Sequence, residues 1–107
     1  AAEMLASEGV SVEVIDPRTL APLDMETILA SVGKTGKLLV ADESFGPCGI
    51  GAEIAAQVMD QGFDDLAAPV RRLNGVHTPT PYSPPLEAAV VPAVDQVAAA
   101  VRELAAE

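Results

Sequence analysis

The segment from residue 70 to residue 87 restricts the fold of this 107-residue chain more than any other feature. It opens as a short β-prone run and then becomes rich in proline, which fixes φ and removes a backbone donor at each position. Such a segment cannot be a helix interior or a central strand. We therefore expect it to run extended over a surface, anchored by Tyr82 and Leu86, and to lead into a helix. The prolines are Pro79, Pro81, Pro84 and Pro85.

Apolar periodicity predicts alternating helices and strands in the rest of the chain. Val10, Val12 and Val14 alternate with polar residues, which is typical of a strand, and residues 38–40 are continuously apolar, as in a strand covered on both faces. The expected helices cover residues 2–8, 25–32, 51–61 and 86–90, with a last helix from residue 92, and the expected strands cover residues 10–15, 37–41 and 70–73. This order predicts one α/β domain, residues 1–107, with a largely parallel sheet.

The charge balance argues against some classes of partner. The chain has 16 acidic and 6 basic side chains and a net charge of −10, whereas nucleic acids and anionic membranes are bound through cations. A single cysteine rules out an internal disulfide and favours the reducing cytoplasm. No apolar run has the length of a membrane span. The chain starts inside a helical pattern without the features of a signal peptide, so we expect a piece of a longer chain.

Two features could in principle carry chemistry. Gly49 and Gly51 open a helix and could leave amides free for an anion, but a tight turn with close strand–helix packing explains them better. Cys48 and His77 are far apart in sequence and make a poor metal-ligand or nucleophile set. We expect a turn cysteine and a loop histidine at an interface, and we assign no catalytic, cofactor-binding or metal-binding residue.

Charged residues at the ends of elements are candidates for contacts instead. Glu43 follows a strand at the edge where α/β proteins bind ligands, and we expect it to pair with an arginine and to order the strand ends. Glu103 and Glu107 put negative charge at a helix C-terminus, where the helix dipole disfavours it. A frayed, solvated end and a docking surface both account for them. The possible partners of Glu43 are Arg18, Arg71 and Arg72.

Three ordered blocks of sequence carry a family resemblance. They are residues 14–24 (VIDPRTLAPLD), residues 40–54 (VADES, then GIGAEI) and residues 68–87 (APVRRL, then TPTPYSPPLE). The chain resembles the C-terminal domain of the transketolase-like superfamily. Within it, the chain looks most like the beta subunit of the thiamine-diphosphate-dependent dehydrogenase component of 2-oxo acid dehydrogenase complexes.

The resemblance implies a three-layer α/β domain in a longer beta subunit whose enzyme oxidatively decarboxylates a 2-oxo acid and transfers the acyl group to lipoamide. Pyruvate, branched-chain oxo acids and acetoin are candidate substrates. Thiamine diphosphate and magnesium would be bound elsewhere in the parent enzyme. The implied partners are an alpha subunit, a second beta subunit and the basic peripheral subunit-binding domain of the acyltransferase core. Candidate interface or docking residues are Arg18, Glu43, Tyr82, Glu103 and Glu107.

The chain also departs from the family pattern, because the strand that should precede the first helix is missing. That strand is internal in the family's sheet, so we expect unpaired edges, completion by another chain and a homo-oligomer. Two alternatives stay open. One is another thiamine-diphosphate enzyme, such as a transketolase or a deoxyxylulose-phosphate synthase. The other is a stand-alone α/β module for dimerisation or ligand binding.

Overall fold

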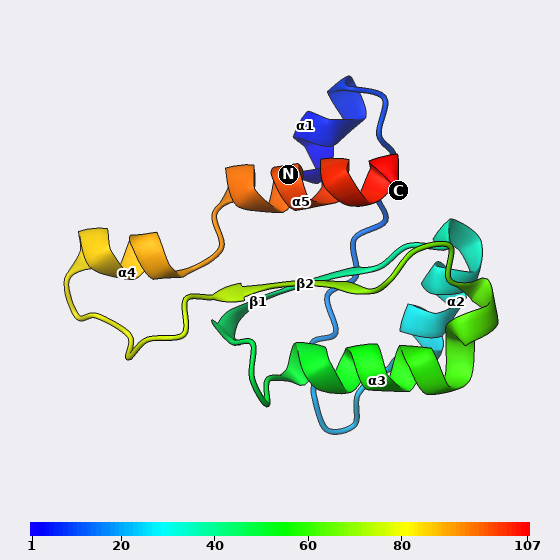
Figure 1. Ribbon diagram of the computed structural model, residues 1–107, viewed down its shortest axis with the longest axis horizontal. Coiled ribbons are helices and arrows are strands. Elements are labelled where there is room, and N and C mark those ends of the chain that lie inside the picture. The colour runs from blue at the N-terminus through cyan, green and yellow to red at the C-terminus, as the bar shows by residue number, and fades with distance from the viewer.

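The computed structural model describes all residues from Ala1 to Glu107 and contains helices on both sides of two parallel strands (Figure 1). The helices α1 and α5 lie on one side of the strands, and α3 lies on the other with α2 packed against it. No helix is both long and apolar enough to cross a membrane. In chain order the elements are α1 (Ala2–Ser7), α2 (Met25–Thr35), β1 (Leu39–Phe45), α3 (Ile50–Gly62), the 3-10 helix η1 (Phe63–Asp65), β2 (Arg71–Gly75), α4 (Pro84–Val90) and α5 (Val94–Ala106).

The sheet consists of β1 and β2 alone, and it confirms the predicted α/β class with parallel pairing. Leu39 lies opposite Arg71, and the pairing continues in register to Asp42. A bulge follows, because Phe45 is the next residue to pair, opposite Gly75. The backbone N–H of Ser44 donates to the Asp42 carboxylate at 3.1 Å inside this bulge, so a side chain satisfies a backbone donor where the strand pairing is interrupted.

The boundaries of α2 follow from its capping residues. Asp24 is the N-cap, as predicted, and its carboxylate accepts a hydrogen bond from the Thr27 backbone N–H at 3.1 Å. The helix was expected to end at Gly33 but continues to Thr35. Gly36 ends it instead, because this glycine adopts a φ of 72° and its N–H returns to the Val32 carbonyl.

The core is small and lies mainly between α2 and α3. Only 10 of the 107 residues are buried, and none of them is polar or charged. One cluster joins the two helices beneath the strands, and a few buried residues join α1 and α5 above them. A core of this size leaves much apolar surface uncovered. The α2–α3 cluster is Ile28, Val32, Ile54 and Val58, and the buried residues of α1 and α5 are Leu5, Ala98 and Leu104.

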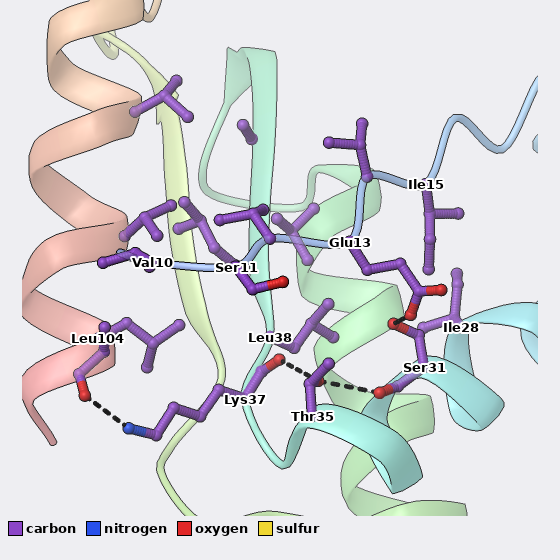
Figure 2. A pocket seen from close by; sticks show the side chains of 18 of the residues that line it. Val10, Ser11, Glu13, Ile15, Ile28, Ser31, Thr35, Lys37, Leu38 and Leu104 are labelled. Carbon is purple, nitrogen blue, oxygen red and sulfur yellow. Dashed lines mark hydrogen bonds between the residues drawn. The ribbon is translucent and has the colours of Figure 1, made fainter. Parts of the chain in front are cut away.

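The predicted strand at residues 10–15 is not formed. The segment runs across the strand direction instead of along β1, as both views show (Figures 1 and 2). Only the Val10 N–H in this segment donates to another backbone group, the Leu5 carbonyl at 3.0 Å. The side chain of Glu13 accepts a hydrogen bond from the Ser31 hydroxyl at 2.6 Å, which ties the segment to α2 away from the edge of β1. The prediction of a strand at residues 10–15 is therefore wrong, because the segment pairs with no strand edge.

Candidate functional site

Residues 76–90, called the arm below, project from the carboxyl end of the two strands (Figure 1). The Val76 N–H donates to the Val90 carbonyl at 2.8 Å and closes the base of the arm. Tyr82 is fully exposed, and Leu86 is 58% exposed. The prediction that these two side chains anchor the segment is therefore wrong, because no helix covers them. The expected helix exists as α4, which begins at Pro84 since proline is tolerated in a first turn.

Gly75 makes the base of the arm tight, a role that sequence reasoning missed. A Cβ atom built on Gly75 would collide with the Glu43 carbonyl oxygen and would lie 3.1 Å from the Val90 carbonyl oxygen. The main chains of the β1 bulge, the end of β2 and the end of α4 thus meet at this residue. No spacing in the sequence indicates this contact, because the three segments are far apart along the chain.

The expected ion pair of Glu43 is absent. Arg18 bonds its near neighbour Asp16, with 3.1 Å between Nε and Oδ2, and both side chains are largely exposed. Arg72 donates from Nη1 to the Gly46 carbonyl at 3.1 Å, which fastens the turn after β1. Glu43 makes no ion pair with any arginine and remains exposed at the bulge.

The two acidic residues at the C-terminal end of α5 differ in their partners: Glu107 is in an ion pair and Glu103 is not. Glu107 forms an ion pair with Arg71 of β2, and this contact raises the pKa of the arginine, with a smaller contribution from Glu103. Glu103 itself is exposed and makes no ion pair. The end of α5 is also held by Lys37, whose Nζ donates to the Ala105 carbonyl at 2.9 Å. Glu107 is thus already engaged within the chain, which the frayed-end interpretation did not anticipate.

The thiol, imidazole and glycine candidates do not assemble a reactive centre. Cys48 is exposed at a φ of 58°, and the His77 ring lies 5.3 Å from the Phe45 ring, tilted by 54°. No group of three or more potential metal ligands exists in the chain. A Cβ on Gly49 would stand 2.5 Å from the Phe45 carbonyl oxygen, so a glycine is needed there for close packing. This geometry agrees with the structural interpretation of the glycine turn.

The largest cavity, about 390 Å³, lies between residues 10–15, β1 and the inner faces of α2 and α5 (Figure 2). Its walls are mostly apolar, with Ile28, Leu38 and Leu104 among them. Its polar side carries Glu13, whose pKa is lowered first by the Ser31 hydroxyl and then by Lys34, 3.4 Å away. One carboxylate that is already satisfied cannot provide acid–base catalysis by a pair of groups. The cavity can hold apolar groups and carries no evident chemistry.

The fold and surface together define a small parallel α/β domain with a projecting proline-rich arm. A family model described as the C-terminal domain of transketolase matches residues 1–97. The chain therefore belongs to the transketolase C-terminal domain family.

Curated relatives specify the branch of this family. The chain is 48% identical to the beta subunit of an acetoin:2,6-dichlorophenolindophenol oxidoreductase from Cupriavidus necator. The 103 aligned residues cover 96% of this chain and 30% of the relative. The corresponding subunit from Bacillus subtilis is 44% identical over 107 residues, 100% of this chain and 31% of the relative. The mitochondrial pyruvate dehydrogenase E1 component subunit beta from Dictyostelium discoideum is 50% identical over 103 residues, 95% of this chain and 29% of the relative. The chain thus spans about a third of the length of these relatives, all of them beta subunits.

Proposed function

We propose that this chain is the C-terminal assembly and docking domain of the beta subunit of a thiamine-diphosphate-dependent 2-oxo acid dehydrogenase. The similarity to beta subunits along 95–100% of the chain carries the proposal. The parent reaction would be oxidative decarboxylation of a 2-oxo acid, with acyl transfer to lipoamide. Beta subunits named for acetoin and for pyruvate enzymes are similarly identical to this chain, at 48% and 50%. Acetoin and pyruvate therefore both stay candidate substrates of the parent enzyme.

The domain contributes to assembly and not to bond-making in this proposal. The chain has no cluster of metal-binding side chains, so its residues do not fit a site for magnesium. We assign magnesium and thiamine diphosphate to other parts of the parent enzyme. The assembly partners would be an alpha subunit and a second beta subunit, in the cytoplasm. The relatives from rice, pea and Dictyostelium carry mitochondrial names.

The docking partner would be the basic subunit-binding domain of an acyltransferase core. The end of α5 supports this, because Glu103 is exposed and makes no ion pair, while Glu107 is held by Arg71. An acidic helix end meeting basic side chains would speed association and set specificity more than it would add affinity. In the isolated chain we expect self-association through the open edges of the two-stranded sheet.

A titration of the assembled enzyme with the subunit-binding domain, at low and high salt, tests the docking role. We expect saturable binding that weakens with salt, and we expect Glu103→Lys to weaken it further. Glu26→Lys on α2 is a matched control, since it reverses an exposed charge in another helix. Unchanged, salt-sensitive binding by the Glu103→Lys enzyme would rule out docking at α5.

Two other functions stay in competition. A different transketolase-like enzyme would lack a separate alpha subunit and would not bind an acyltransferase core. A stand-alone dimerisation or ligand-binding module would be a stable species without any partner chain. Co-purification of the natural protein with its partners, followed by mass determination, separates these cases from the proposed one.

A further inference from the structure

The carboxyl end of the sheet and the arm carry four large apolar side chains that are partly or, for Tyr82, fully exposed. Phe45 ends β1, Val76 follows β2, and Tyr82 and Leu86 belong to the arm that starts there. Figure 1 shows α4 standing apart from both helical layers. No residue of α4 is buried. Binding of α4 and the Tyr82 ring to a partner would break few contacts within the chain, because neither is packed against the rest of the domain.

The two ends of the arm are held by contacts within the chain, although Tyr82 near its middle is fully exposed. The bond from Val76 to Val90, the close approach at Gly75 and the ring contact between Phe45 and His77 together hold the two ends of the arm. Proline restricts the φ angles between them, and Ser83 has φ −66° and ψ 127°, close to polyproline II geometry. A restricted arm costs less conformational entropy on binding than a free loop does.

The charges around this surface determine what kind of partner can meet it. All six basic side chains of the chain are already bound to a carboxylate or a carbonyl within the chain, whereas only four of its 16 acidic side chains are in ion pairs. Glu43 at the bulge and Glu87 on α4 are exposed and unpaired. The exposed apolar side chains are therefore accompanied by two unpaired carboxylates, while the one cation bonded to the turn after β1, Arg72, is held by the Gly46 carbonyl.

We propose that this arm-end surface, formed by Phe45, Val76, Tyr82 and Leu86 with Glu43 and Glu87, docks into an apolar pocket rimmed by Lys or Arg on a different polypeptide. The inference rests on the proposed function, because it assigns the contact to the partner subunit of the parent enzyme. Tyr82 enters the pocket as the anchor, since buried aromatic side chains dominate interface energetics. The two carboxylates meet the basic rim and set the approach.

A second copy of this chain is a poor occupant of the same surface. A copy presents no free basic side chain, and it brings the same exposed carboxylates against Glu43 and Glu87. Juxtaposed like charges suppress such pairings. The arm-end surface thus selects for a heterologous contact, and any self-association of the chain would use another face.

The test measures binding between the full-length beta subunit and its partner subunit for Tyr82→Ser and for a matched control, Phe63→Ser. Phe63 is an aromatic residue of η1 and is 61% exposed. It directly follows α3, whose C-terminal end lies at the opposite end of the strands from the arm (Figure 1). We expect Tyr82→Ser to raise Kd about thirtyfold and Phe63→Ser to change it less than about twofold. The thermal midpoint of the free subunit should be unchanged by Tyr82→Ser, because the ring contacts nothing in the chain.

Salt and charge provide a second readout. Wild-type affinity should fall as salt is raised, and a Glu43→Gln, Glu87→Gln double variant should lose part of this dependence. A Tyr82→Ser subunit that binds its partner like wild type would overturn the proposal while leaving the proposed function intact. A wild-type subunit that binds no partner subunit would instead refute the proposed function. Loss of self-association by Tyr82→Ser, with partner binding unchanged, would identify a second copy as the occupant and would also overturn the proposal.

Discussion

Replacing Gly75 by alanine tests whether the base of the arm is as tightly packed as the structure indicates. The added methyl group would collide with the carbonyl oxygen of Glu43 and would stand 3.1 Å from that of Val90. Both neighbours are backbone atoms, so neither can rotate away as a side chain would. Relief requires either opening the β1 bulge away from β2 or lifting the end of α4.

The magnitude follows from these two routes. Forcing an extra carbon into a packed site costs about 1–3 kcal/mol. Lifting the end of α4 also breaks the hydrogen bond from Val76 to Val90, which adds about 1 kcal/mol. We therefore expect Gly75→Ala to lower the free energy of unfolding by about 2–4 kcal/mol, a large share of the ~5–15 kcal/mol typical of a domain.

Urea denaturation followed by far-ultraviolet circular dichroism measures this change, with Gly33→Ala as the control. A Cβ on Gly33 would lie 3.5 Å from an oxygen of the Asp65 side chain, an ordinary contact, and alanine in a helix interior is favoured over glycine by about 0.5–1 kcal/mol. The control should therefore be neutral or more stable. A Gly75→Ala protein within about 0.5 kcal/mol of wild type would refute the packing argument.

Three further predictions concern the two helical layers and the segment before α2. Leu5→Ala should lower the free energy of unfolding by about 2–4 kcal/mol in the same urea assay, because Leu5 is fully buried against α5. Met4→Ala is the control: Met4 is 41% exposed, so this change should cost less than about 1 kcal/mol. The pKa of Glu8 is lowered chiefly by its hydrogen bond from Arg102 of α5. This contact therefore stabilises the fold at pH values above the ordinary pKa of a glutamate, and the stabilisation is lost as pH falls through the lowered pKa. Glu8→Gln should thus reduce the fall of the thermal midpoint below about pH 4.5, and an unaltered pH profile would contradict this. Backbone amides of residues 11–15 should exchange with solvent faster than those of β1 by hydrogen-exchange mass spectrometry, and equal protection would mean that the segment pairs with the sheet.

Local sequence signals located the helices well because their ends are set by single residues. Asp24 begins α2 as expected, whereas α4 begins at Pro84, two residues before the expected helix at residues 86–90, because proline suits a first helical turn. The boundary at Gly33 was wrong for a physical reason: the backbone stays helical at Gly33 and turns left-handed at Gly36, where α2 ends. Periodicity could not distinguish these two glycines.

Long-range contacts were beyond the reach of the sequence. The alternation of Val10, Val12 and Val14 fits a strand, but a strand also needs a partner edge, and here the Glu13 carboxylate binds α2 instead. The three arginines named as possible partners of Glu43 all bind other acceptors, since ion-pair choice depends on which segments the fold brings together. The family resemblance identified the class of protein, because it depends on three blocks of sequence in a fixed order and not on which residues are in contact.

The two helical layers are held to the strands by different forces, and this difference bears on docking. Below the strands, α2 and α3 share an apolar cluster. Above them, α5 buries few residues and is fastened by polar contacts at its C-terminal end, where Arg71 binds Glu107, Lys37 binds the Ala105 carbonyl and Arg102 binds Glu8 of α1. Exposed ion pairs weaken with salt and acid, whereas apolar burial does not, so α5 should loosen before α3 does. The proposed docking residue Glu103 lies on this weaker layer, so a basic partner that covered the end of α5 would stabilise the domain at the place where it needs support most.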